Sequence, residues 1–215
     1  MSSSIPVKMK PLLRGHFHQS AFFFALGACL MMLANTADQQ TFVSAFIYSL
    51  SLTAMFGISA LYHRPRWSHR AYMFMRRLDH AAIFILIAGT STPLFVLAVG
   101  GTVGQQLAVG IWASALVGVA QATFWTRAPK VVSIGLYIFC GWYAAPYLRE
   151  IHARLGSENV ALVIAGGLIY TAGALIYAFK RPNPNPQVFG YHEIFHLLVI
   201  IAATLHFIVI ARLVN

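Results

Sequence analysis

Five polar residues lie at the ends of long apolar stretches, a position that calls for a chemical explanation. Ser59 and His63 are four residues apart, a spacing that places both side chains on one face of a helix. His192 and His196 share that spacing, and Asp79 stands at the start of another apolar stretch. Ionisable side chains are costly within a bilayer and usually have a partner or a task there. These five residues are therefore the candidates for a functional site.

The three histidines could bind one zinc ion together. Imidazole nitrogen is a ligand that Zn²⁺ favours, and catalytic zinc sites combine three protein ligands with a fourth position held by water. Zinc lowers the pKa of that water toward about 7, so that hydroxide is available near neutral pH. On this interpretation, His63, His192 and His196 hold Zn²⁺ as a cofactor. Asp79 and Ser59 are the predicted catalytic residues: Asp79 would accept or orient the proton of the water, and Ser59 would add a supporting hydrogen bond.

The stretch from His192 to His196 also matches the motif H-E-x-x-H, in which the glutamate is the general base of a zinc protease. Intramembrane proteases that use this motif also need a distant aspartate, typically within Asp-Gly. No Asp-Gly pair occurs in this chain, and Asp79 is followed by His80. A protease with Glu193 as its base is therefore the less favoured alternative.

Membrane-spanning helices are the elements that must position these residues. Of the 215 residues, 59% are hydrophobic and 9% are charged, against about 25% charged in a soluble domain. A crossing needs about 20 mainly apolar residues, and seven such stretches recur between polar, Gly-rich or Pro-rich breaks. They are Gln19–Ala37, Thr41–Leu61, Asp79–Val99, Gln105–Trp125, Val131–Tyr147, Asn159–Phe179 and Tyr191–Arg212. The sequence thus predicts an all-α fold, one seven-transmembrane-helix domain over residues 1–215, with residues 1–18 as a short N-terminal segment.

The basic residues orient the predicted bundle. Twelve of the 15 fall in the N-terminal segment or in alternate loops: Lys8, Lys10, Arg14, Arg64, Arg66, Arg70, Arg76, Arg77, Arg127, Lys130, Lys180 and Arg181. Arg149, Arg154 and Arg212 fall on the other side. Because cytoplasmic loops carry the excess of Lys and Arg, we predict a cytoplasmic N-terminus and a C-terminus outside. The candidate metal ligands then all lie at the cytoplasmic ends of their helices.

A net charge of +10 is compatible with nucleic-acid binding, but the distribution of the charges argues against it. The basic residues occupy short loops between apolar stretches, where they set membrane topology. We therefore predict membrane lipids, and no nucleic acid, as partners. Cys29 and Cys140 lie within apolar stretches and are interpreted as small buried residues.

Taken together, the polar motifs resemble the hemolysin III family, which is related to the progestin and adiponectin receptors. The resemblance rests on Ser-Ala-Leu-Tyr-His at 59–63, Leu-Asp-His-Ala-Ala-Ile-Phe-Ile-Leu-Ile-Ala-Gly-Thr-Ser-Thr-Pro at 78–93, His-Glu-Ile-Phe-His at 192–196 and the following Leu205-His-Phe. It covers essentially the whole chain. It implies a seven-helix bundle with a cytoplasmic N-terminus in a bacterial inner membrane, and zinc bound by the three histidines with Asp79 and Ser59 beside it.

One departure from the family is visible near the start of the first span. Many bacterial members have a Glu and an Asn ahead of the first-span histidine, whereas this chain has Leu-Leu-Arg-Gly-His16-Phe-His18. Any role of that glutamate therefore does not transfer to this chain.

The resemblance also carries a functional implication. The wider superfamily includes alkaline ceramidases, so the resemblance implies a zinc-dependent hydrolase of lipid amide or ester bonds that takes part in membrane lipid homeostasis. Two alternatives stay open, namely a non-catalytic receptor or regulator with structural zinc, and a pore-forming, haemolytic protein. The sequence leaves the oligomeric state open.

The remaining histidines of the helices are expected to have other roles. His80 is rotated by about 100° from its neighbour in a helix, so we expect packing or an interfacial hydrogen bond. His206 lies about 15 Å along the helix axis from His196, and we expect a polar contact deep in the bundle. His16 and His18 are expected to lie near the inner interface in contact with water.

Overall fold

The computed structural model describes residues 10–214, which form a bundle of helices. Residues 1–9, with Lys8, lie outside the described residues, so the predicted segment 1–18 is described only from Lys10 onward. The α-helices are α1 (His16–Ala34), α2 (Gln39–His63), α3 (His69–Pro93), α4 (Gly101–Phe124), α5 (Lys130–Gly141), α6 (Leu148–Phe179) and α7 (Tyr191–Val214). A π-helical segment, η1 (Leu94–Val99), follows α3, and a 3-10 turn, η2 (Ala145–Tyr147), precedes α6. The all-α prediction is thus confirmed for the described residues.

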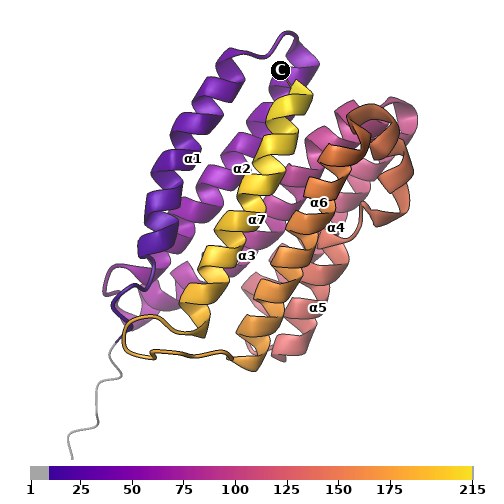
Figure 1. The fold of residues 1–215 in the computed structure, drawn as a ribbon. Coiled ribbons are helices and arrows are strands. Elements are labelled where there is room, and N and C mark those ends of the chain that lie inside the picture. The colour runs from indigo at the N-terminus through magenta and orange to yellow at the C-terminus, as the bar shows by residue number, and fades with distance from the viewer. Residues whose placement is uncertain (1–9, 215) are drawn as a thin grey trace, which may run out of the picture.

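Helix α7 occupies a central place in the bundle (Figure 1). It packs against α6 and also against α1, α2 and α3. One apolar cluster, which includes Tyr48 and Ile210, joins α1, α2, α3 and α7. A second cluster, which includes Phe84 and Ile111, joins α3 to α4 and α5. Because α3 belongs to both clusters, it links the two halves of the bundle.

The outer surface of the bundle is strongly apolar. Phe24, Phe124 and Val131 are 80%, 86% and 81% exposed. Exposed apolar area of this kind is costly in water but is covered by the hydrocarbon tails of a bilayer. Among the described residues, six helical segments are long and apolar enough to cross a membrane. The chain is therefore a multi-pass membrane protein.

The predicted fifth span forms only a short α-helix. α5 ends at Gly141 after 12 residues, so it extends about 18 Å, whereas the hydrocarbon core is about 30 Å thick. Helix α6 begins earlier than predicted, at Leu148, and bends at Gly156, where φ is 75° and ψ is 171°. The residues Lys130–Phe179 together make up one of the six candidate spans. Seven separate crossings therefore stay a prediction.

Helix α3 begins well before the predicted third span, at His69 instead of Asp79. The Ser68 hydroxyl accepts a hydrogen bond from the Ala71 N–H at 3.4 Å and so caps the helix. Asp79 consequently lies inside the helix and not at its start. At the far end, Pro93 lacks an N–H group, and the chain continues as the π-helical η1 until Gly100, where φ is 71°.

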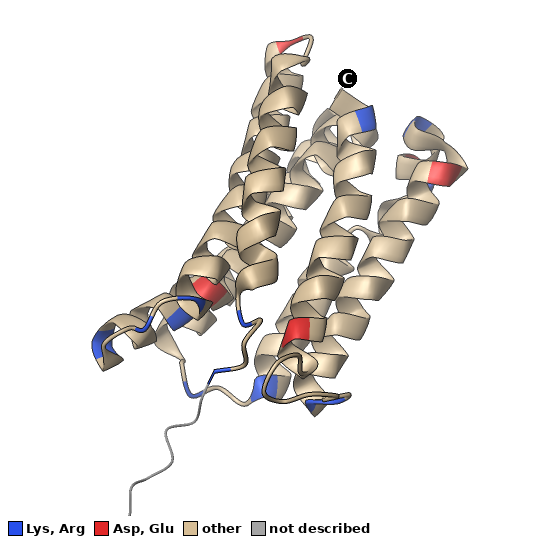
Figure 2. Ribbon diagram, turned by 60° about the vertical axis from the view of Figure 1, so that its left-hand side comes forward, with Lys and Arg blue, Asp and Glu red and all other residues tan. Residues whose placement is uncertain are grey.

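The basic residues gather at one end of the bundle, the end away from the C-terminus (Figure 2). The loops after α2, α4 and α6 lie at this end, together with the chain that leads into α1. The asymmetry of charge that the sequence predicts is therefore present in the folded chain.

Candidate metal centre

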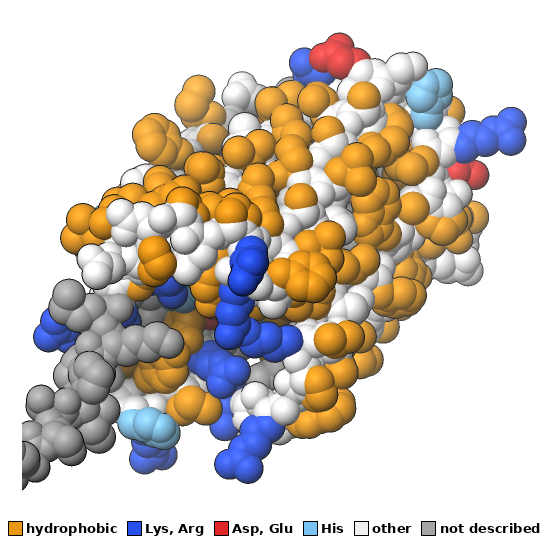
Figure 3. Space-filling view, turned by 60° about the horizontal axis from the view of Figure 1, so that its bottom comes forward, with side chains coloured by type: hydrophobic (Ala, Val, Ile, Leu, Met, Phe, Trp, Pro, Cys, Tyr) orange, Lys and Arg blue, Asp and Glu red, His pale blue; other side chains and the backbone are white. Residues whose placement is uncertain are grey.

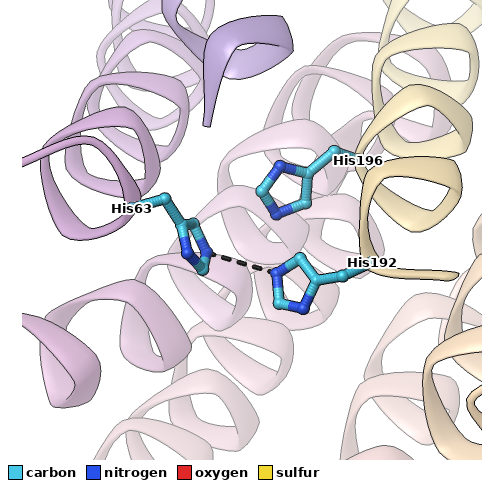
Figure 4. A group of neighbouring side chains, drawn as sticks. All are labelled: His63, His192 and His196. Carbon is cyan, nitrogen blue, oxygen red and sulfur yellow. Dashed lines mark hydrogen bonds between the residues drawn. The ribbon is translucent and has the colours of Figure 1, made fainter. Parts of the chain in front are cut away.

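His63, His192 and His196 meet at the basic end of the bundle (Figure 4). His63 is the last residue of α2, and the other two lie in the first two turns of α7. Their ligand atoms lie within 4.8 Å of one another, and Nε2 of His63 is 3.3 Å from Nε2 of His192. His63 and His196 are buried and His192 is partly buried. The structure thus brings the three predicted ligands together from two helices.

Local sequence explains where these helices begin and end. Pro65 follows the end of α2 and cannot continue a helix, because it has no N–H to donate. At the start of α7, the Gly190 N–H donates to Oε2 of Glu193 at 2.9 Å, as in a capping box. The Tyr191 N–H donates to Oδ1 of Asn183 at 3.1 Å. These two bonds satisfy backbone groups that a helix start leaves free, and so they fix the helix that carries His192.

Two of the three donors already have the spacing of a zinc site, while the ligand atoms of the whole group lie within 4.8 Å of one another. Zn–N bonds of about 2.0–2.1 Å place neighbouring nitrogens of a tetrahedral site about 3.3 Å apart, which is the separation of the two Nε2 atoms of His63 and His192. Nδ1 of His196 is buried and has no hydrogen-bond partner among the residues that the structure describes. A buried imidazole nitrogen without a partner is costly, so a ligand for this group would stabilise it. The three histidines could therefore hold a metal ion.

Asp79 adds a carboxylate from a third helix, α3. Its Oδ2 is 3.9 Å from Nε2 of His63, and its side chain is 14% exposed. The same oxygen is 3.8 Å from Nδ1 of His80. The carboxylate is thus close to the histidine group without forming a normal hydrogen bond to it. Its negative charge would offset part of the charge of a bound cation.

His18 belongs to this site, and the prediction that it is in contact with water is wrong. It is 2% exposed, and its ring is stacked on that of His196 with 3.9 Å between centroids and 8° between planes. Its Nδ1 shares a hydrogen bond of 2.8 Å with the hydroxyl of Ser59. Ser59 of α2 is therefore bonded to a histidine of α1. The only signal in the sequence was that His18 begins an apolar stretch at the same end as the other histidines.

Glu193 lies between two of the candidate ligands in sequence but faces another group. Its side chain is 1% exposed and forms an ion pair with Nε of Arg14. It also accepts the Gly190 N–H. Both carboxylate oxygens are thus engaged, one in a salt bridge and one at the helix start. These contacts favour a structural role for Glu193 over that of a protease base.

The segment ahead of α1 lies at the basic end of the bundle and forms hydrogen bonds with the chain after α2 and before α7. Nζ of Lys10 donates to the carbonyl of Pro65 at 2.9 Å and to that of His63 at 3.3 Å. Burial and the charges of Arg14 and Arg66 lower the pKa of Lys10. The Leu12 and Leu13 N–H groups donate to the loop ahead of α7, to the carbonyls of residues 187 and 188. This segment therefore ties the end of α2 to the start of α7.

His80, His206 and His16 make the kinds of contact expected of them. His80 donates from Nδ1 to the carbonyl of Arg76 at 2.8 Å. His206 donates from Nε2 to the carbonyl of Val163 at 3.1 Å, which links α7 to α6. His16 is exposed and forms a hydrogen bond with Arg64.

Apolar helices and a buried group of histidines at one end define a multi-pass membrane protein with a candidate metal centre. The chain belongs to the Haemolysin-III related family, whose sequence profile matches residues 7–207. The Hemolysin-3 homolog of Bacillus subtilis (strain 168) is 28% identical over 177 residues, which cover 82% of this chain and 79% of the relative. This finding confirms the family predicted from the polar motifs.

Eukaryotic proteins are also similar to this chain. The monocyte to macrophage differentiation factor of Homo sapiens is 28% identical over 169 residues, covering 77% of this chain and 68% of the relative. The heptahelical transmembrane protein ADIPOR2 of Oryza sativa subsp. japonica is 27% identical over 164 residues, covering 69% and 71% of the two chains. The predicted relation to the adiponectin receptor family is thereby confirmed.

Proposed function

We propose that this protein is a zinc-dependent hydrolase of lipid amide or ester bonds, embedded in the bacterial inner membrane and active in membrane lipid homeostasis. The observation that carries the proposal is the meeting of three imidazoles, two buried and one partly buried, with the Asp79 carboxylate, all at one end of a membrane-spanning bundle. Three protein ligands leave a fourth position for water, whereas structural zinc sites have four protein ligands.

Each residue of the site has a defined task in this reaction. His63, His192 and His196 would hold the zinc, which supplies a Lewis acid and a hydroxide source near neutral pH. Asp79 would take a proton from the attacking water and return it to the leaving amine or alkoxide as the C–N or C–O bond breaks. Ser59 would act through His18, because its hydroxyl holds the ring that stacks on His196.

Seven crossings with a cytoplasmic N-terminus are part of the proposal. α5 together with the residues up to η2 would form the fifth crossing, and α6 would return the chain to the basic end. The packing of α5 on α6 is consistent with two neighbouring crossings. The rice relative carries the word heptahelical in its name. The excess of basic residues at one end then places the metal centre near the cytoplasmic boundary.

Metal analysis and lipid hydrolysis of the purified protein test the proposal. We expect about one zinc per chain and release of fatty acid from at least one member of a panel of lipid amides and esters. His196→Ala should remove both, whereas His16→Ala, which changes an exposed histidine of the same end, should remove neither. Zinc retained without turnover of any lipid in the panel would argue strongly against the hydrolase.

A receptor or regulator with structural zinc is the second candidate. It is favoured by the way in which the histidines join α2 to α7, a link that an ion would strengthen. The two candidates differ at Asp79. Asp79→Asn should abolish hydrolysis while the protein keeps its zinc, whereas a purely structural centre should keep its function in that variant. Conductance across a reconstituted bilayer would instead support the pore-forming alternative.

A further inference from the structure

A recess lies beside the metal centre, at the basic end of the bundle. Residues of α3, α4, α5 and α6 line it, and its volume is about 630 Å³ with the open space at its mouth included. Three of the lining residues are the cations Arg76, Arg77 and Lys130. The described residues that line the recess include no Asp or Glu. Figure 3 shows that Lys and Arg side chains gather on this face of the molecule. We call this recess the basic pocket.

Among the described residues, no carboxylate forms an ion pair with the cations of the basic pocket. In the described part of the chain, Lys and Arg residues make two ion pairs, Arg14 with Glu193 and Arg212 with Glu158. Neither pair involves a residue of the basic pocket. A concave surface lined by one sign of charge concentrates ions of the opposite sign, and an anion bound there would relieve the repulsion among the cations.

The chemistry of the lining favours phosphate among anions. The planar guanidinium of arginine matches two oxygens of a phosphate at once, and a lysine ammonium adds a point charge. Ser133 and Gln121, which also line the basic pocket, bring a hydroxyl and an amide group. Trp125, another lining residue, is 53% exposed. Tryptophan is enriched at the level of the lipid headgroups, which places the mouth of the pocket where lipid phosphates lie.

The basic pocket is separated from the metal centre by one layer of side chains. Tyr177 lines the pocket, and its ring centroid is 5.4 Å from that of His192. His80 lines it as well, and its Nδ1 is 3.8 Å from Oδ2 of Asp79. Nζ of Lys130 lies 5.4 Å from the centroid of the Tyr177 ring. A phosphate held in the pocket would therefore lie one layer of side chains, formed by Tyr177 and His80, away from the metal centre.

We infer that the basic pocket binds the phosphate of an anionic lipid headgroup through Arg76, Arg77 and Lys130. The pocket thereby selects anionic phospholipids as substrates of the neighbouring centre, an assignment that rests on the proposed function. Binding itself needs no turnover, so it can be measured whether or not the centre hydrolyses lipid.

Calorimetric titration of the full-length protein in a neutral detergent tests the inference. The probes are a short-chain phosphatidate and the diacylglycerol with the same acyl chains, which differ only in the phosphate. We expect the phosphatidate to bind and the diacylglycerol to bind at least about tenfold more weakly. Inorganic phosphate is the third probe. If inorganic phosphate displaces the phosphatidate, the phosphate group by itself is sufficient for binding. If the phosphatidate binds and inorganic phosphate does not displace it, the lipid part is required as well. Both results support a phosphate site.

Two triple variants decide whether the pocket is responsible. Arg76→Gln/Arg77→Gln/Lys130→Gln should weaken phosphatidate binding by about tenfold or more. The matched control, Arg66→Gln/Arg70→Gln/Arg181→Gln, removes the same charge from exposed positions of the same end and should change binding less than about twofold. Equal losses in the two variants would show general attraction to a basic surface and would overturn the inference. Equal binding of phosphatidate and diacylglycerol by the wild type would overturn it too.

Metal content separates this inference from the proposed function. All variants should keep the zinc content of the wild type, because none of the changed residues is a candidate ligand. Zinc bound without phosphatidate binding refutes the pocket alone, and phosphatidate binding without lipid hydrolysis refutes the hydrolase alone. If the triple pocket variant does not fold, Lys130→Gln, which changes an exposed residue at the start of α5, should still lower the affinity about threefold. An unchanged affinity in that variant would count against the pocket.

Discussion

The imidazoles of the candidate centre are held by neighbours from other parts of the chain. His18 of α1 covers one face of the His196 ring, and its Nδ1 is tied to Ser59 of α2. Groups that orient a metal ligand commonly change metal affinity when they are removed, although they do not touch the ion. The stacking contact gives His18 this kind of role.

Replacing His18 should therefore weaken metal binding without abolishing it. We expect His18→Ala to lower zinc affinity by about tenfold, because the His196 ring loses its stacking partner. Competition with a zinc chelator measures this change. His16→Ala, two residues away and exposed, is the control and should leave the affinity unchanged. Complete loss of zinc in His18→Ala would instead identify His18 as a ligand.

Glu193 should contribute to stability more than to chemistry. We expect Glu193→Ala to lower the free energy of unfolding by about 3 kcal/mol, because it leaves Arg14 without its buried partner. Glu158→Ala breaks the exposed pair with Arg212 and should cost less than about 1 kcal/mol. Unfolding in detergent followed by circular dichroism measures both. A Glu193→Gln variant with normal stability and no hydrolysis would revive the role of Glu193 as a base.

At the scale of elements, close contact between α2 and α3 sets the position of Asp79 relative to His63. Gly89 of α3 lies against Ser51 of α2, and a Cβ at position 89 would overlap the Ser51 side chain. Small residues allow membrane helices to approach in this way. The spacing of the two helices that carry His63 and Asp79 therefore depends on a small residue, Gly89, which lies farther along the bundle.

Enlarging Gly89 should separate these helices. We expect Gly89→Ala to destabilise the protein by about 1–3 kcal/mol through overpacking. Thermal unfolding of the purified protein measures the effect. Gly27→Ala in α1 is the control, because an added Cβ there meets no described atom within 4 Å. Equal stability of the two variants would show that α2 and α3 adjust to the added methyl group without cost.

For the molecule as a whole, the side on which each terminus lies depends on the number of crossings. An odd number places the N- and C-termini on opposite sides, and six crossings would place them on the same side. The basic residues favour a cytoplasmic N-terminus. The short α5 is the element on which the count depends.

Reporter fusions at the C-terminus distinguish the two counts. We expect alkaline phosphatase to be active there, because it folds outside the cytoplasm, and green fluorescent protein to be dark. A fusion within the loop between α6 and α7 should give the opposite pattern. A fluorescent C-terminal fusion would show that α5 does not cross the membrane.

The sequence by itself determined the class of the protein and the three candidate metal ligands. Long apolar stretches need no tertiary information, because each helix satisfies its own backbone hydrogen bonds within the bilayer. The spacing of His192 and His196 placed both on one helical face, and the alternation of basic loops placed their end of α7 beside the end of α2 that carries His63. These signals are local or follow from topology, so they can be read from the chain.

Only the tertiary structure decided which neighbours complete the site. The stacking of His18 on His196, the pairing of Glu193 with Arg14 and the basic pocket all join residues from different helices. Such contacts depend on the rotation and spacing of packed helices, which an apolar stretch does not encode: lipid-facing and buried positions are both hydrophobic. For the same reason the break of the fifth span at Gly141 was not apparent in its mainly apolar sequence.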